Sequence, residues 1–405
     1  MILLIFTMIP IIMLVFIYVS YYRLMLRYSK RGVSWKTGKL KPNVSLIIAT
    51  YNEEATLPAK LRNVLEQDYP KDRLELVLID SGSTDASPKI SEEFIRQNPN
   101  LNTVFIRENE RLGKSHALNI AYPKASGQVK IISDSDSLLE RSAITRIVRN
   151  FKDPSIGAAF GRQILLNPDE NPTTMLEKSY KDIWEVLRRG ESILDSTPLF
   201  DGELSAYRAD LIEPLPENKS GDDARMANII RRKGYRAVCD SSALFYEYAP
   251  PNSHARSIQK IRRAQGLIRV FWDFKNCMFK KEYGDYGRLI LPMEFFMHCV
   301  FPTLWLILLV TFFASLALYS LIGLLVSLAL VAGFLLLGRI TSLPIRVRTV
   351  VDLGSTFFAS QFFLLYATIL WISGRSLHKW QKVEDIRKEW KAGEKSQFLK
   401  SDRLA

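Results

Sequence analysis

The chain has 405 residues, of which 47% are hydrophobic, and a formal net charge of +13. This length allows two or three structural units and a sizeable core. The three cysteines, Cys239, Cys277 and Cys299, fit neither a zinc site nor a disulfide framework, which suits a reducing compartment. Much of the positive charge lies beside hydrophobic segments. This pattern favours contact with anionic lipid head groups, and we expect no nucleic-acid partner.

Residues 1–22 carry no charge and are long enough to cross a bilayer. A secretory signal peptide is the alternative, but the segment lacks a basic start and a small-residue cleavage site. Seven basic residues follow without an acid among them: Arg23, Arg27, Lys30, Arg31, Lys36, Lys39 and Lys41. Because basic flanks stay in the cytoplasm, we expect an integral protein of the cell membrane with its N-terminus outside and the following domain cytoplasmic.

Residues 42–250 alternate short β-rich apolar runs with segments of helical period. The expected strands are 44–50, 74–80, 102–107 and 128–133, and the expected helices are 54–67, 85–97, 117–122 and 140–151. This alternation predicts an α/β domain with a mainly parallel, Rossmann-like sheet. Polar clusters follow three of the strands, at Thr50, Asp80 and Asp134. Right-handed crossovers bring these strand ends to one edge, where a nucleotide phosphate could bind.

Asp134 and Asp136 follow an apolar run directly and are one residue apart. On extended backbone the two side chains point the same way, so one can face a nucleotide while the other reaches a cation. Hard cations such as Mg²⁺ or Mn²⁺ prefer carboxylate and phosphate oxygens. The pattern is therefore compatible with a metal–diphosphate site, and a solvated turn or helix cap is the alternative.

Three further polar segments allow a structural and a functional interpretation. In residues 80–85, Ser83 or Thr84 could act as the N-cap of the following helix. Lys114 follows Gly113 at an expected helix N-terminus, where amides and an ammonium can hold an anion, although the Walker spacing is absent. The acids at 222 and 223 could cap a helix over 224–232.

The order of these polar segments along the chain resembles that in the family 2 inverting glycosyltransferases with a GT-A fold. This family includes synthases of the cellulose, hyaluronan and poly-N-acetylglucosamine type and lipid-acceptor transferases. The matching segments are 44–54, 80–85, 113–114 and 134–136, followed by 200–208, 221–223, 234–238 and 247–250. Together they extend over about half of the chain. The resemblance implies a sugar transferase that uses a nucleotide-sugar, with a UDP-sugar favoured.

The resemblance also implies roles for individual residues. On the donor side, Asp80 would bind the nucleotide base, Thr50 and Glu53 would line the base and ribose, and Lys114 and Asp134 would contact the donor. Asp136 would ligate the Mg²⁺ or Mn²⁺. Asp223 would be the general base that removes a proton from the acceptor hydroxyl. The acceptor-side residues would be Gly202, Glu203, Asp222, Gln259, Arg262 and Arg263.

Two positions depart from the family pattern. Ser81 replaces the usual second acid after Asp80, which weakens one base or ribose contact. Arg263 replaces the tryptophan of the Gln-x-x-Arg-Trp motif of processive synthases, and arginine pairs well with phosphate. We therefore expect a single transfer onto a lipid-linked acceptor. The alternatives are a processive polysaccharide synthase and, from another class, a noncatalytic membrane protein that binds or transports sugar.

The C-terminal part contains further segments that we expect at or in the membrane. Residues 251–288 are expected to form an amphipathic interfacial segment, and 289–374 a transmembrane region with two to four crossings. Within it, 289–338 could form two spans joined near 316–320, and 353–374 a third. Three C-terminal spans would place the basic tail, residues 375–405, outside. The positive-inside rule opposes that arrangement, so the topology stays open.

Overall fold

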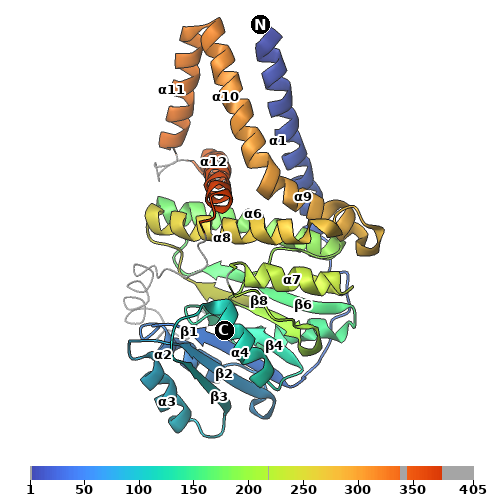
Figure 1. The fold of residues 1–405 in the computed structure, drawn as a ribbon, viewed down its shortest axis with the longest axis vertical. Coiled ribbons are helices and arrows are strands. Elements are labelled where there is room, and N and C mark those ends of the chain that lie inside the picture. The colour runs from blue at the N-terminus through green and yellow to red at the C-terminus, as the bar shows by residue number, and fades with distance from the viewer. Residues whose placement is uncertain (1, 218, 338–343, 376–405) are drawn as a thin grey trace.

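The computed structural model describes residues 2–217, 219–337 and 344–375, and the tail from residue 376 lies outside them. An α/β domain forms one end of the molecule (Figure 1). Long helices rise from the other side of two crosswise helices, α6 and α8. The α/β class with a mainly parallel sheet, expected from the sequence, is confirmed.

An eight-stranded sheet has the order β3-β2-β1-β4-β7-β6-β8-β5 among the described residues. Its first four strands are parallel and confirm the four expected from the sequence, with ends that differ by a few residues. The others add three antiparallel pairings, β4 with β7, β6 with β7 and β5 with β8, and one parallel pairing, β6 with β8. The strands are β1 Val44–Thr50, β2 Leu74–Ser81, β3 Asn102–Glu108, β4 Val129–Ile132, β5 Leu138–Leu139, β6 Ile156–Leu165, β7 Ser205–Arg208 and β8 Arg236–Glu247.

Hydrophobic side chains on both faces of the sheet are buried under helices, and every residue of β2 is buried. The covering helices are α2 Leu57–Leu65, α3 Ser87–Gln97, α4 Lys114–Lys124, α5 Ala143–Val148 and α7 Asp222–Arg232. The expectation that Ser83 or Thr84 caps α3 was wrong, because the helix begins at Ser87 after Ala86. The turn is closed instead by Asp85, whose Oδ1 accepts a hydrogen bond from the Ser87 amide at 3.0 Å.

The N-terminal helix α1, Ile2–Ser29, packs directly on α6, Pro172–Leu194. A Cβ added at Gly190 would lie 2.3 Å from the carbonyl oxygen of Met25, so only glycine allows this approach. One turn away, the Tyr21 hydroxyl donates a buried hydrogen bond of 2.6 Å to Glu191. The apolar helix is thereby fixed to the α/β domain.

The amphipathic segment expected after residue 250 forms α8, Ser253–Phe274, which lies beside α6 (Figure 1). Glu177 of α6 accepts hydrogen bonds from Arg256 at 3.0 Å and Lys260 at 2.6 Å, and all three side chains are buried. Removing one partner would leave a buried charge unpaired at a cost of several kcal/mol, about 3–5. These buried ion pairs therefore fix the position of α8 relative to α6.

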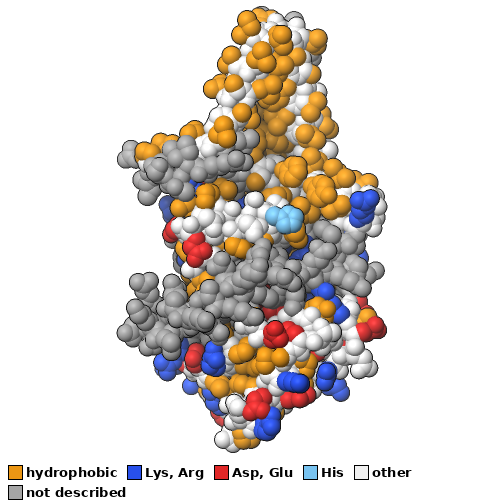
Figure 2. Space-filling model, turned by 90° about the vertical axis from the view of Figure 1, so that its left-hand side faces the viewer, with side chains coloured by type: hydrophobic (Ala, Val, Ile, Leu, Met, Phe, Trp, Pro, Cys, Tyr) orange, Lys and Arg blue, Asp and Glu red, His pale blue; other side chains and the backbone are white. Residues whose placement is uncertain are grey.

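The C-terminal apolar region contains α9 Leu291–Phe295, α10 Phe301–Tyr319 and α11 Leu321–Leu337. The break at Ser320 lies at the expected junction. Three helical stretches among the described residues are long and apolar enough to cross a membrane, namely Phe6–Ser29, Tyr286–Tyr319 and Val350–Ile372, and α11 holds a shorter apolar stretch. Figure 2 shows hydrophobic side chains over the end with the upright helices and charged side chains over the α/β domain. These features indicate a membrane protein.

The last helix, α12 Ile345–Ile372, has a different direction. Figure 1 shows it end-on, whereas α1, α10 and α11 run along the long axis. Near its start, Arg348 Nη2 lies 3.2 Å from Met175 Sδ of α6. At its other end, the Arg375 carbonyl accepts a hydrogen bond of 2.7 Å from Gln265 of α8. Both ends of α12 thus contact the same α/β domain.

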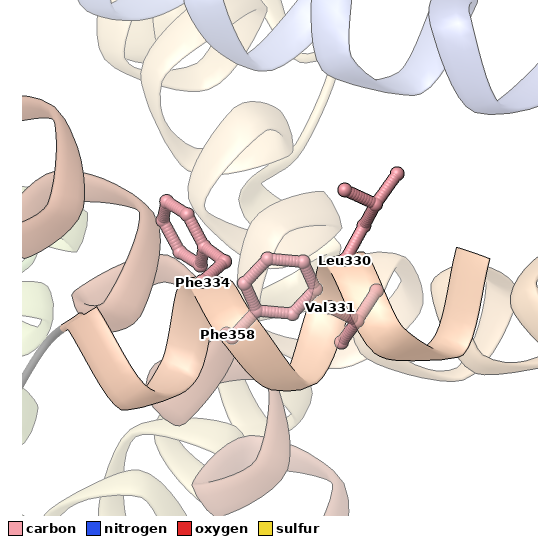
Figure 3. Close-up of a pocket in the computed structure, with 4 residues that line it drawn as sticks. All are labelled: Leu330, Val331, Phe334 and Phe358. Atoms are coloured by element: carbon pink, nitrogen blue, oxygen red, sulfur yellow. The ribbon is translucent and has the colours of Figure 1, made fainter. Parts of the chain in front are cut away.

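A cavity of about 260 Å³ lies between α11 and α12. Its lining is apolar and consists of Leu330, Val331, Phe334 and Phe358 (Figure 3). No acid or base lines it, and the polar strand ends described below are elsewhere in the molecule. It offers no group for chemistry.

Candidate active site

The carboxyl ends of β1, β2 and β4 lie at one edge of the sheet. Thr50 pairs with Asp80 in the β1–β2 register, and Ile47 pairs with Ile132 in the β1–β4 register. Residues 133–137, called the acid loop below, follow β4 directly and contain Asp134 and Asp136. In open sheets of this kind, ligands bind at this edge.

Asp80 is buried at the end of β2. Its Oδ2 accepts a hydrogen bond of 3.0 Å from the Ser83 amide, and the Thr50 hydroxyl lies 3.5 Å from Oδ1. Glu53 is also buried, but it accepts a 2.9 Å hydrogen bond from Thr56 and braces the start of α2. Asp80 and Thr50 are therefore adjacent as expected, and a donor contact by Glu53 stays a prediction.

An acid from another strand lies beside Ser81. The Ser81 hydroxyl donates a hydrogen bond to Glu108 at the end of β3, and Glu108 also lies 3.2 Å from His116. Burial raises the pKa of Glu108, and the nearby Asp80 carboxylate adds to this effect. The sequence interpretation missed Glu108, because the strand pairing that brings it beside Ser81 is not visible in a motif.

Lys114, the first residue of α4, links the acid loop to α7. Its Nζ lies 2.6 Å from Asp134 Oδ1 and 3.9 Å from Asp222 Oδ2. Burial alone would lower the pKa of Lys114, but Asp134 and Asp222 outweigh it and raise that pKa. The ammonium is therefore charged and lies between two carboxylates, where a diphosphate could also bind it.

Asp223 lies beside Lys114 in the first turn of α7. The alternative, that the acids at 222 and 223 cap a helix over 224–232, was wrong, because the helix begins at Asp222 and its N-cap is Gly221. A Cβ added at Gly202 would lie 3.0 Å from Lys114 Nζ and 3.7 Å from Asp223 Oδ2, so the loop, the lysine and the acid meet here. Burial, and then the charge of Asp222, raise the pKa of Asp223 to about 7. A carboxyl group with such a pKa suits general-base work near neutral pH.

On the acceptor side, Arg263 of α8 is already paired. Its guanidinium lies 2.5 Å from Glu203 and 3.9 Å from Asp201. Asp201 is also paired with Arg188 of α6. The charge of Arg263 is thus balanced within the protein, and its position alone no longer supports recognition of a phosphate-bearing acceptor.

Arg262 and Gln259 occupy the same helix, α8, and both are partly buried. Burial, followed by the charge of Arg263, lowers the pKa of Arg262, and Asp134, Asp222 and Asp136 oppose this shift. Arg262 is therefore close to the acid loop and to the start of α7. The structure thus brings Arg262 to the site, and an acceptor-side role for Gln259 stays a prediction.

Two buried residues at the acid loop were missed by the sequence interpretation. Lys60 of α2 donates hydrogen bonds to Ser133 and Ser137, and burial lowers its pKa to about 7 against the attraction of Asp134 and Asp136. Glu247 ends β8, and burial raises its pKa well above the usual range, with Glu203 and Asp136 adding to the effect. The apolar run before Asp134 gave no signal for either residue.

The acid loop fits a divalent cation only together with a ligand. Among the residues that the structure describes, no group of three or more His, Cys, Asp and Glu side chains could hold a metal ion. Mg²⁺ is commonly bound by one or two carboxylates and substrate phosphates, without a complete protein cage. The carboxylates of Asp134 and Asp136 match that incomplete ligand set, so the residues fit the metal.

This mixed sheet, with the acid loop at the carboxyl ends of its parallel strands, has the GT-A fold of glycosyltransferases. Residues 131–337, more than half of the chain, match the model described as glycosyl transferase family group 2, and residues 45–215 match glycosyl transferase family 2. The chain belongs to the family 2 glycosyltransferases.

A solved structure covers nearly the whole chain. The mannosyltransferase PcManGT from Pyrobaculum calidifontis, in complex with GDP-Man and Mn²⁺, has a TM-score of 0.77 and 28% identity, covering 92% of this chain and 100% of its own. The poly-beta-1,6-N-acetyl-D-glucosamine synthase of Staphylococcus aureus is 24% identical over 248 residues, 60% of this chain and 59% of the synthase. The beta-monoglucosyldiacylglycerol synthase of Synechocystis is 32% identical over 130 residues, 32% of this chain and 27% of that relative. The chain thus spans less than two thirds of these two curated relatives.

Proposed function

We propose that this glycosyltransferase depends on a divalent metal, inverts the anomeric configuration and transfers one sugar from a nucleoside diphosphate sugar to a lipid-linked acceptor. The single observation that supports this most is the position of Lys114, between Asp134 and Asp222 and next to Asp223. This position supports an arrangement in which a cation for the diphosphate lies beside the carboxyl group that would act as the base. Sugar transfer needs both groups in one place.

The chemistry follows from these side chains. Asp223 accepts the proton of the acceptor hydroxyl as that oxygen attacks the anomeric carbon. The bond from this carbon to the diphosphate oxygen breaks on the opposite face, which inverts the configuration. Lys114 places positive charge beside the leaving diphosphate. When bound at Asp136, Mg²⁺ or Mn²⁺ neutralises negative charge on the leaving group.

The nature of the donor rests on two arguments. The sequence favours a UDP-sugar, whereas PcManGT was solved with GDP-Man. Asp80 with Thr50 provides acceptors for a base, and Glu108 adds a carboxyl group next to them. Both donor classes are therefore candidates for the same site.

A lipid-linked acceptor is supported by the position of α8. This helix carries Arg262 and Arg263 and lies between the sheet and the upright apolar helices (Figure 1). An acceptor anchored in a bilayer would present its head group on that side. The short match to a diacylglycerol glycosyltransferase agrees with a lipid product.

The test is an assay of membranes that contain the full chain, with radiolabelled UDP- and GDP-sugars and Mn²⁺. We expect label from one donor to enter material that extracts with lipid, and chelation to stop the transfer. Label in a long polymer would instead identify a processive synthase. Absence of transfer from every donor would overturn the proposal.

We also propose a topology in which α12 lies along the membrane surface. A helix of 28 residues is about 42 Å long, more than the thickness of the hydrocarbon core, so a crossing would separate its ends by a bilayer. Contacts with Met175 and Gln265 keep both ends on the α/β domain. Crossings by α1, α10 and α11 alone then leave the basic tail on the domain's side, as the positive-inside rule requires.

Cysteine labelling tests this topology. With a membrane-impermeant thiol reagent, we expect Ser320→Cys, at the α10–α11 turn, to react in intact cells. Ser373→Cys, an exposed position after α12, should react only after the cells are permeabilised. The unchanged chain, with its three cysteines, is the control. Reaction of Ser373→Cys in intact cells would show that α12 crosses the membrane.

A further inference from the structure

Lys60 is a completely buried lysine on α2, behind the acid loop. Its Nζ donates hydrogen bonds to the Ser133 hydroxyl at 2.6 Å and to the Ser137 carbonyl at 2.8 Å. These two residues are the first and last of the acid loop. A single ammonium group therefore ties together both ends of the segment that carries Asp134 and Asp136.

The same hydrogen bonds continue on either side. The Ser133 hydroxyl, which accepts from Lys60, donates to the Glu203 carbonyl at 2.7 Å. The Ser137 hydroxyl donates to the Asp134 carbonyl at 3.0 Å. The lysine thus fixes the loop against the segment that contains Gly202 and Glu203, next to Lys114 and Asp223.

A buried ammonium is expensive unless its hydrogen bonds and nearby charges compensate for lost hydration. Its direct partners in the structure are neutral oxygens, and the carboxylates of Asp134 and Asp136 are close enough to interact with its charge. The packing of α2 alone requires no charge at this position. A positive charge behind two carboxylates reduces their mutual repulsion.

We propose that Lys60 is a positioning residue for metal and diphosphate binding, acting through Ser133 and Ser137. It holds the acid loop in the conformation that presents Asp136 before the metal–nucleotide complex arrives. Lys60 lies on α2, which follows the donor-side end of β1, so it also connects the base-binding edge to the acid loop. The inference rests on the proposed function, because it assumes that Asp136 holds the metal.

The test measures Mn²⁺ binding to the detergent-solubilised full chain, by electron paramagnetic resonance, in the presence of GDP or UDP. Lys60→Met retains an unbranched side chain and replaces the ammonium end with an apolar one. We expect Mn²⁺ affinity to fall by roughly 10- to 100-fold, the usual cost of losing a group that orients a metal ligand. Binding of the nucleoside monophosphate without metal should not change, because the base contacts stay.

Lys71→Met is the matched control. The Lys71 ammonium also donates to several oxygens, but these are the carbonyls of Val64, Leu65 and Gln67 at the end of α2. The substitution Lys71→Met therefore removes an ammonium group that contacts the end of α2 and leaves the acid loop unchanged. We expect Mn²⁺ affinity close to that of the wild type, even if the melting temperature falls.

Ser133→Ala provides a second, smaller change and decides the question if Lys60→Met does not fold. It removes the hydroxyl that joins Lys60 to Glu203 and should weaken Mn²⁺ binding in the same direction. Wild-type affinity in a folded Lys60→Met protein, or in Ser133→Ala if that protein alone folds, would overturn the inference. A wild-type chain that binds no Mn²⁺ with either nucleotide would instead count against the proposed function.

Discussion

Replacing Asp223 with asparagine is expected to lower kcat by about 10²- to 10⁴-fold, the usual contribution of a general base. The amide keeps the size of the side chain but cannot accept the proton of the acceptor hydroxyl. Donor and metal binding should remain, since Lys114 and the acid loop are unchanged. Turnover with the labelled donor, together with Mn²⁺ and nucleotide binding, measures both effects.

The pH profile gives an independent check of the same group. Because burial and Asp222 raise the pKa of Asp223 to about 7, the basic form disappears as the pH falls through 7. Activity should therefore decrease on the acidic side of neutrality. In Asp222→Asn the repelling charge is absent, so this limb should move to lower pH. Wild-type turnover in Asp223→Asn would exclude this residue as the base.

Asp136→Ala is expected to abolish metal-dependent binding of the donor and to reduce transfer by at least about 10²-fold. The reason is electrostatic, since the diphosphate would leave without the cation that this carboxylate holds. Calorimetry with nucleotide-sugar, with and without Mn²⁺, separates metal-dependent affinity from the contacts of the base. Only the metal-dependent part should disappear.

A surface acid provides the control for this second change. Asp169 is exposed and forms an ion pair with Lys178 at 3.2 Å. Asp169→Ala should bind donor and metal as the wild type does. If Asp136→Ala also retained wild-type metal dependence, the metal would have to bind through other residues.

Much of the candidate donor side could be predicted from local sequence. Apolar β-rich runs marked β1, β2 and β4, and the rule that parallel strands end at one edge placed Thr50, Asp80 and Asp134 together. Lys114 was found from its position at a helix start. In each case the signal lies within a few residues of the functional side chain.

Residues that reach the site from other elements could not be predicted in this way. Lys60 and Glu108 contact the site through pairings 73 and 27 residues apart along the chain. The motif position of Arg263 was clear, but its ion pairs with Glu203 and Asp201 depend on how α8 packs against the loop. Charge alone does not tell whether an arginine is available to a ligand.

The direction of α12 could not be predicted from hydropathy for a similar reason. Composition shows that Val350–Ile372 is long and apolar enough to cross a membrane. Direction depends on tertiary contacts, and here these are the contacts of its two ends with α6 and α8. The same lack of tertiary information explains the misplaced cap of α3.

The attachment of α12 at both ends has a consequence for acceptor choice. Contacts join α12 to α6 and α8, and α6 packs on β8 of the sheet, so a tilt of the α/β domain away from α12 would break them. In the proposed topology, the height of Asp223 above the lipid head groups is therefore constant. The enzyme would therefore select acceptors by the length of their head group, since only a hydroxyl at that distance from the membrane can reach Asp223.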